Sequence, residues 1–384
     1  MRWLWFLIAS AISWISRLSG RGEGSTIAGA TLLKLSPNII SKLASHRRVL
    51  LVSGTNGKTS TSKMIVRALG SQRVASNESG ANLPAGIATA LALAPRADFA
   101  ILEVDELYFP QVLEQTRAEK VLLLNLSRDQ LHRTQEVRIV CNRWKVAIKN
   151  SKIKPVIYID AGDPFLASVV RDYPNAIRVG FGARYHPDAA SCPECGVLIN
   201  FEVSGSLFSC PGCKLGEESL DFEFTPREAL ARNAAIAEVV VRDFGVPHIE
   251  IGDPIDRVST IEINGVKIAM KLVKNPASWQ EGISALAPQD PVILIVNARG
   301  VDGLDTSWLW DVDFRALGSH KVFVTGDRYR DVAYRIHVDE VTFESAPSLE
   351  ELAAKMSHAG ISEASALASY TAFMEIASKV RVKK

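Results

Sequence analysis

The segment VLLVSGTNGKTSTSKMIVRAL, residues 49–69, decides the fold of this chain. Its first residues form an apolar run typical of a buried parallel strand, and a glycine loop and a helical pattern follow. Backbone amides of such a loop can converge on phosphate oxygens, while Lys58 adds positive charge and Thr59 can hold Mg²⁺ at the helix start. The segment therefore predicts a phosphate-binding loop, with nucleotide-binding residues Gly54, Thr55, Asn56, Gly57, Lys58, Thr59 and Ser60.

The pattern around this segment predicts an α/β architecture with a parallel sheet. Apolar runs at 99–104, 120–126 and 155–160 alternate with helical stretches, as in a doubly wound fold. Before the first strand we expect one helical segment around Leu32 to Leu43.

A second, smaller α/β domain is predicted toward the carboxyl end. A long helical stretch ends at Gly245 and Pro247, where we place a domain boundary. A hairpin through Asn264 and Gly265 and two apolar runs follow, a pattern that predicts a Rossmann-like α/β domain. The predicted parts are a helical segment at 1–45, a nucleotide-binding domain at 46–247 and a C-terminal domain at 248–384.

Composition excludes several classes of protein. Of the 384 residues, 47% are apolar and 22% are charged, which is outside the range of disordered and collagen-like chains. The 44 basic residues nearly balance the 42 acidic ones, giving a net charge of +2, so nothing in the bulk charge indicates a nucleic-acid partner.

The amino terminus is unusually apolar. Trp3 to Ser16 carry no charge between Arg2 and Arg17, but this run is shorter than the roughly 20 residues that a transmembrane helix needs. A signal peptide is an alternative, although no clean small-residue cleavage site follows. The remaining interpretations are a helix that docks on the body of the protein, which we favour slightly, and a helix that lies in a membrane interface. The predicted location is cytoplasmic, with peripheral contact at the inner face of the plasma membrane as an option.

Four of the five cysteines form two CxxC pairs. Cys192/Cys195 and Cys210/Cys213 have the spacing of a zinc ribbon, here predicted at 190–216, and four thiolates would make a closed, structural zinc site. The fifth, Cys141, lies in a helical stretch and is predicted to be a buried small hydrophobe.

Acidic residues follow the second predicted strand. In ILEVDE, Glu103 closes the strand at the carboxyl edge of the sheet, where a carboxylate can hold a magnesium ion that bridges nucleotide and substrate. Asp105 and Glu106 are candidates to share that task, but for either alone we expect exposure to solvent.

Taken in order, these motifs resemble the MurT family, the Mur-ligase-like subunits of lipid II isoglutaminyl synthase. The resemblance rests on SGTNGKTSTS, SGANLPAGIATAL, LEVDE, NLSRDQLHR, the cysteine ribbon, VKNPASWQE, DGLDTSWLWDVDF and YTAFMEI. It implies a Mur-ligase-type ATPase domain with an inserted ribbon, and an enzyme subunit that uses Mg-ATP to phosphorylate the α-carboxyl of D-isoglutamate in the lipid II stem peptide. Ammonia from a separate GatD-type glutaminase subunit then gives D-isoglutamine.

The resemblance also implies roles for single residues. Asn82 and Asn125 would lie near the phosphates or the acyl acceptor, Asn233 near the nucleotide base, and Lys274 in the cleft that closes on substrate. Lys58 and Glu103 would take part in phosphoryl transfer. An aspartate would complete the partner's glutaminase site, with Asp305 favoured and Asp302 second.

Two other functions remain as alternatives. The first is a stand-alone ligase that joins an amino acid to a carboxylate, as a folylpolyglutamate synthase does. The second is a zinc-ribbon binding module with ATP as a switch, against which the balanced charge counts.

Overall fold

The computed structural model describes residues 2–18, 26–77, 80–128, 136–201, 207–226, 228–252, 258–299 and 304–382. They divide into two compact units. The first holds the described residues up to Ser127 and those from 136 to 252, and the second holds Arg128 and the residues from 258 onward. The residue bounds of the three predicted parts stay a prediction.

The first unit is built on a seven-stranded sheet in the order β2-β3-β1-β4-β5-β6-β7, with every pair parallel. Its strands are β1 (Arg48–Ser53), β2 (Val74–Ser76), β3 (Phe99–Glu103), β4 (Lys120–Leu123), β5 (Val156–Asp160), β6 (Ala176–Gly180) and β7 (Phe222–Glu223). Its helices are α1 (Arg2–Leu18), α2 (Ile27–Leu35), α3 (Ile39–Ala44), α4 (Lys58–Ala68), α5 (Pro84–Leu93), α6 (Phe109–Thr116), α7 (Val137–Asn150), α8 (Pro164–Val169) and α9 (Ala229–Asp243).

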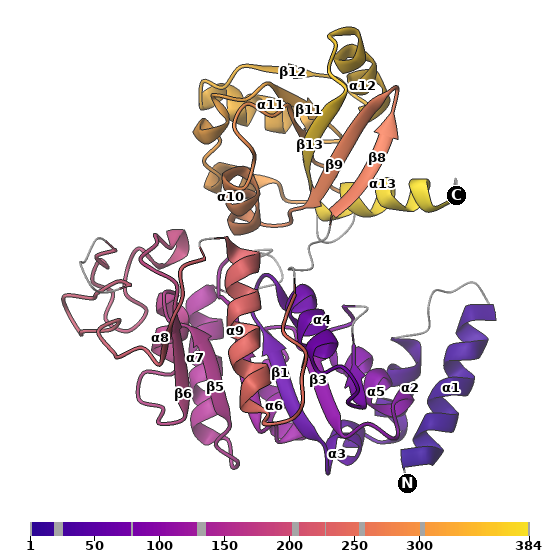
Figure 1. Ribbon diagram of the computed structural model, residues 1–384, viewed down its shortest axis with the longest axis vertical. Helices are drawn as coiled ribbons and strands as arrows, with labels where there is room; N and C mark the ends of the chain where they lie inside the picture. The colour runs from indigo at the N-terminus through magenta and orange to yellow at the C-terminus, as the bar shows by residue number, and fades with distance from the viewer. Residues whose placement is uncertain are drawn as a thin grey trace. The chain divides into compact units, whose positions relative to one another are not determined.

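Helices cover both faces of this sheet, as the prediction of a doubly wound fold requires (Figure 1). Alternate residues of β1 point into the hydrophobic cores on the two sides of the sheet. Val49 and Leu51 pack in the core with α3, α5, α6 and α7, and Leu50 and Val52 pack in the core with α4 and α9. Because both faces are covered, β1 is apolar almost throughout rather than alternating. The predicted parallel α/β fold is confirmed.

One predicted element is wrong. The expected helix around Leu32 to Leu43 is two helices, α2 and α3, that are separated at Ser36 and Pro37. Proline disfavours the helical conformation of the residue before it, and Ser36 is extended, with φ −150° and ψ 97°. The chain therefore turns between two short helices.

The second unit has a six-stranded sheet in the order β12-β11-β10-β13-β9-β8, parallel except for the β8–β9 hairpin. Its strands are β8 (Val258–Ile263), β9 (Val266–Leu272), β10 (Val292–Ile295), β11 (Val322–Thr325), β12 (Phe343–Ser345) and β13 (Glu363–Ala368). Its helices are α10 (Pro276–Ser284), α11 (Tyr329–Val338), α12 (Leu349–His358) and α13 (Tyr370–Val382). The predicted hairpin turn is confirmed, since Asn264 and Gly265 have the positive φ that its tight turn requires.

Candidate functional site

The phosphate loop connects β1 to α4 at the carboxyl edge of the first sheet. Gly54 and Gly57 have φ of 139° and 84°, which L side chains rarely adopt. Neither position has room for a side chain. A Cβ atom on Gly54 would lie 3.0 Å from the backbone of Asn125, and one on Gly57 would lie 2.2 Å from Nδ2 of Asn233. Both glycines are therefore required by the geometry of the loop.

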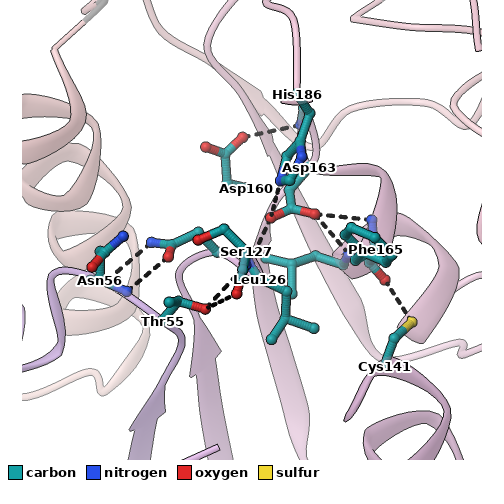
Figure 2. A network of polar contacts seen from close by, with 12 residues as sticks. Thr55, Asn56, Leu126, Ser127, Cys141, Asp160, Asp163, Phe165 and His186 are labelled. Carbon is teal, nitrogen blue, oxygen red and sulfur yellow. Dashed lines mark hydrogen bonds and ion pairs between the residues drawn. The ribbon is translucent and has the colours of Figure 1, made fainter. Parts of the chain in front are cut away.

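A neighbouring loop holds the phosphate loop in place. The side chain of Asn125 accepts a 2.8 Å hydrogen bond from the amide of Asn56 and donates a 3.0 Å bond to its carbonyl. The hydroxyl of Thr55 donates to the carbonyl of Ser127 and accepts from its amide, at 3.1 and 3.0 Å. Figure 2 shows these contacts between the two loops. Asn125, predicted to lie near the phosphates, thus lies directly against the loop.

Glu103 meets the start of α4. The hydroxyl of Thr59 donates a 2.7 Å hydrogen bond to Oε2 of Glu103, and Nδ2 of Asn82 donates a 3.2 Å bond to Oε1. Glu103 is only 3% exposed. A hydroxyl beside a buried carboxylate at the end of a phosphate loop is the oxygen donor set that Mg²⁺ prefers. The structure brings together the two residues predicted to hold magnesium.

Lys58 has an acidic neighbour of its own. Its Nζ donates to the carbonyls of Gly54 and Thr55 and lies 3.3 Å from Oε1 of Glu106. The expectation that Asp105 and Glu106 face solvent is wrong, because both are buried where the chain turns from β3 toward α6. Glu106 therefore belongs to the polar groups around the loop.

Sequence reasoning missed one residue that fixes Glu103. Asn77, which follows β2, accepts from the amide of Glu103 and donates to its carbonyl, both at 2.8 Å. Asn77 comes directly after β2, the strand that pairs with β3, and this position in the sequence could have indicated its contact with Glu103.

The four ribbon cysteines lie together, with all four Sγ atoms within 4.8 Å of one another. The Sγ–Sγ distances are 3.6 Å for Cys192 and Cys213 and 3.4 Å for Cys195 and Cys210. Tetrahedral zinc with Zn–S bonds of about 2.3 Å places its sulfur ligands roughly 3.8 Å apart. The cluster fits a structural zinc ion.

Cys141 is buried in α7, as predicted. Burial raises the pKa of its thiol to about 12, and its Sγ contacts the carbonyl of Phe165 at 3.4 Å. It is thus an inert thiol at neutral pH.

The predicted residues of the second unit lie in other local settings. Lys274 follows β9, and its amide donates to the hydroxyl of Ser278 at 2.9 Å. Asp305 is exposed, and its carboxylate accepts a 2.8 Å hydrogen bond from the amide of Ser307. Asp302 lies outside the described residues.

The fold and the loop define a class. Residues 52–190 match the family model of the Mur ligase middle domain. The crystal structure of MurF ligase from Thermotoga maritima, a complex with ADP, shares the fold, with a TM-score of 0.61, 17% identity and coverage of 90% of this chain and 81% of that one. Residues 52–190 therefore match the Mur ligase superfamily, and the chain shares the fold of a Mur ligase.

Within that superfamily the relationship is more specific. Residues 272–373 match the MurT ligase C-terminal family. The chain is 27% identical to the lipid II isoglutaminyl synthase (glutamine-hydrolyzing) subunit MurT of Streptococcus pneumoniae, over 96% of this chain and 95% of that one. Identity to the Staphylococcus aureus subunit of the same name is 26%, over 88% of each chain. The chain is thus similar to MurT subunits over most of its length, and residues 272–373 match the C-terminal family of these ligases.

Proposed function

We propose that this chain is the synthetase subunit of a lipid II isoglutaminyl synthase. It would convert the α-carboxyl of D-isoglutamate in the lipid II stem peptide to the amide of D-isoglutamine, with ATP as the second substrate. The name of the streptococcal and staphylococcal relatives supports the reaction and the need for a partner subunit. The observation that carries the proposal is the hydrogen bond between Thr59, which follows Lys58 at the phosphate loop, and the buried carboxylate of Glu103.

The reaction needs activation because a carboxylate is inert to ammonia. In the proposed first step a carboxylate oxygen attacks the γ-phosphorus of ATP, ADP leaves and an acyl phosphate forms. Ammonia then attacks the carbonyl carbon, and phosphate leaves with the original carboxylate oxygen. Both steps depend mainly on positioning and on neutralised phosphate charge.

The residues of the loop fit this task. Amides of residues 54–58 would bind the phosphates, and Lys58 would move from the Glu106 carboxylate to the terminal phosphate. Magnesium would neutralise phosphate charge, with Thr59 and Glu103 as the residues that hold it. Asn233, whose side-chain amide lies next to Gly57, would contact the nucleotide beside the loop.

The nitrogen is proposed to come from a GatD-type glutaminase subunit. A glutaminase of that kind needs a reactive thiol, whereas four of the five cysteines of this chain form the ribbon cluster and the fifth is buried. Asp305, and Asp302 as the second choice, remain our candidates to complete the partner's site. The ribbon cysteines are proposed to hold zinc.

Contact with a membrane is proposed through α1, which packs against α2 and α5 and so docks on the first unit. Among the described residues, none of the helices has the length and hydropathy needed to cross a bilayer. For residues 2–16 of α1, whose burial is described, the exposed positions fall within an arc of about 120° at 3.6 residues per turn, and each of them is apolar. They are Trp3, Leu4, Leu7, Ala11, Trp14 and Ile15.

Two serines lie on the opposite face. Ser13 and Ser16 are buried against the unit, so the helix is more polar inside than outside. It has no acidic residue, Arg2 lies at its start, and the guanidinium of Arg96 lies 5.1 Å from the centre of the Trp3 ring. Apolar side chains flanked by arginine and tryptophan fit the interface of an anionic bilayer.

Vesicle co-sedimentation tests the membrane contact. Trp14→Ser should weaken binding of the full chain to anionic vesicles. Trp310→Ser removes a similarly exposed tryptophan of the second unit and should leave it unchanged. Equal binding of the two variants and the unaltered chain would reject the contact.

The acyl phosphate is tested by isotope transfer. Substrate with an ¹⁸O-labelled α-carboxylate is incubated with the chain, Mg-ATP and ammonium. One label per turnover should appear in the released phosphate, because the phosphorylated oxygen leaves with phosphorus. Amide formation with unlabelled phosphate would contradict this mechanism.

A further inference from the structure

The ribbon is bonded to two helices of the nucleotide-binding unit. Arg138 of α7 donates to the carbonyl oxygens of Ser191 and Cys192, both at 3.0 Å. Glu194 accepts from Lys145 of α7 and from the hydroxyl of Ser168 of α8. The ribbon is thus fixed to the helices that flank β5.

A buried ion pair lies at the base of the ribbon. Nε2 of His186, six residues before the first ribbon cysteine, is 3.5 Å from Oδ2 of Asp163. Burial alone would lower the pKa of His186, but the Asp163 carboxylate raises it above its ordinary 6.5. Burial alone would raise the pKa of Asp163, whereas His186 and backbone amides hold it below 3.8. Each group therefore favours the charged form of the other.

Asp163 joins three parts of the unit. Its Oδ1 accepts from the amides of Phe165 and Leu166, at 2.9 and 3.2 Å, and so caps α8. Its Oδ2 accepts a 2.8 Å bond from the amide of Leu126. In Figure 2, Asp163 lies between Leu126, Phe165 and His186.

Leu126 connects this pair to the phosphate loop. It stands between Asn125 and Ser127, the two residues that hydrogen-bond Asn56 and Thr55. A continuous set of contacts thus runs from the base of the ribbon to the loop. Moving the amide of Leu126 would move both residues that hold the loop.

We propose that His186 and Asp163 are a positioning pair through which the zinc ribbon holds the phosphate loop in its nucleotide-binding conformation. The pair acts on Leu126 and touches no substrate. This inference rests on the proposed nucleotide site and assigns the ribbon a task in that site beyond its own folding. Nucleotide affinity therefore depends on a side chain next to the ribbon.

The test compares two substitutions in the full chain. His186→Phe keeps a ring against Phe165, with which His186 makes an edge contact, but removes the donor to Asp163. Lys145→Met removes another ribbon anchor that lies off the path to Leu126. ADP affinity by calorimetry, zinc content and Tm are measured for both, and His186→Gln, which retains an N–H donor, serves as the rescue variant.

His186→Phe should weaken ADP binding about tenfold with zinc still bound, since it removes a hydrogen bond to a charged group that orders the loop. Lys145→Met should lower Tm with ADP affinity within about twofold of the unaltered chain, a change too small to reflect loss of such a bond. His186→Gln should recover most of the affinity. Equal ADP affinity of His186→Phe and Lys145→Met would overturn the proposal.

A second measurement does not depend on any nucleotide. Amide hydrogen exchange in the segment 54–60 should be faster in His186→Phe than in Lys145→Met, both without ligand. If the unaltered chain bound no ADP, the proposed function would fail, while this exchange difference would still decide the role of the pair. Equal exchange in the two variants would contradict it, and so would a loss of folding in both His186→Phe and His186→Gln.

Discussion

The Nζ atom of Lys58 lies 3.3 Å from Oε1 of Glu106, and each side chain is 7% exposed. An ammonium group and a carboxylate buried together stabilise each other only while both are present, because either one alone would be an uncompensated buried charge. Phosphate oxygens can replace the carboxylate as the partner of Lys58. The pair therefore links the stability of the ligand-free loop to nucleotide binding.

Glu106→Gln should destabilise the ligand-free protein by about 3 kcal/mol, since it leaves a buried ammonium without its counter-charge. ADP should restore much of that loss, so the increase in Tm on adding ADP should be larger than in the unaltered chain. Thermal unfolding with and without ADP measures both effects. An unchanged Tm without ligand would show that the pair contributes no stability.

Glu103→Gln should remove the magnesium-dependent part of nucleotide affinity, by about tenfold, because Glu103 and Thr59 form the proposed magnesium site. Affinity measured in EDTA should stay within about twofold, since the phosphate loop itself is retained. Glu114→Gln removes an exposed carboxylate of α6 and is the control. Equal losses with and without Mg²⁺ would indicate a general defect of the loop.

Cys210→Ser should abolish stoichiometric zinc and lower Tm, because one of four thiolate ligands is lost. Cys141→Ala removes a buried thiol outside the cluster and should keep one zinc per chain. Metal analysis after gel filtration distinguishes the two. Equal zinc content in both variants would refute the ribbon site.

The His186–Asp163 pair predicts a pH dependence of stability. Because the pKa of His186 is raised on folding, the ion pair contributes its full stability below pH 6.5, the ordinary pKa of histidine. This contribution is lost as the pH rises through the pKa of His186 in the folded state. Because the pKa of Asp163 is lowered on folding, this carboxylate contributes stability above pH 3.8. That contribution is lost as the pH falls through the pKa of Asp163 in the folded state. Asp188 favours the charged form of His186, and Arg184 opposes it.

Between pH 6 and pH 9, Tm of the unaltered chain should therefore fall more steeply than Tm of His186→Gln, in which the titrating group is absent. Scanning calorimetry at fixed ionic strength gives the two slopes. Parallel slopes would mean that the pKa of His186 is the same in the folded and unfolded states.

Local sequence signals were sufficient for the strand, loop and helix around Lys58, because glycine spacing and an apolar run specify that geometry within 21 residues. The CxxC pairs were equally local. The break between α2 and α3 also has a local signal, because Pro37 disfavours the helical conformation of Ser36.

The interactions of Asp163 and His186 could not be predicted in this way. They are 23 positions apart, and charged residues in loops are exposed in most proteins, so only the fold shows that they meet. The same holds for Glu106, which is buried beside Lys58 of the phosphate loop. A surface helix usually turns its apolar face toward the core, but α1 turns Ser13 and Ser16 inward. Only its packing against the unit shows which face is covered.

The central claim is tested most directly by mass spectrometry of lipid II incubated with the purified chain, Mg-ATP and ammonium chloride, with a parallel sample given glutamine instead. The ammonium sample alone should show the small mass loss of a carboxyl OH replaced by NH₂, since this chain is proposed to lack glutaminase activity of its own. A mass gain of one amino-acid residue, when amino acids are supplied, would favour a stand-alone ligase. No ATP-dependent change in lipid II would contradict the account.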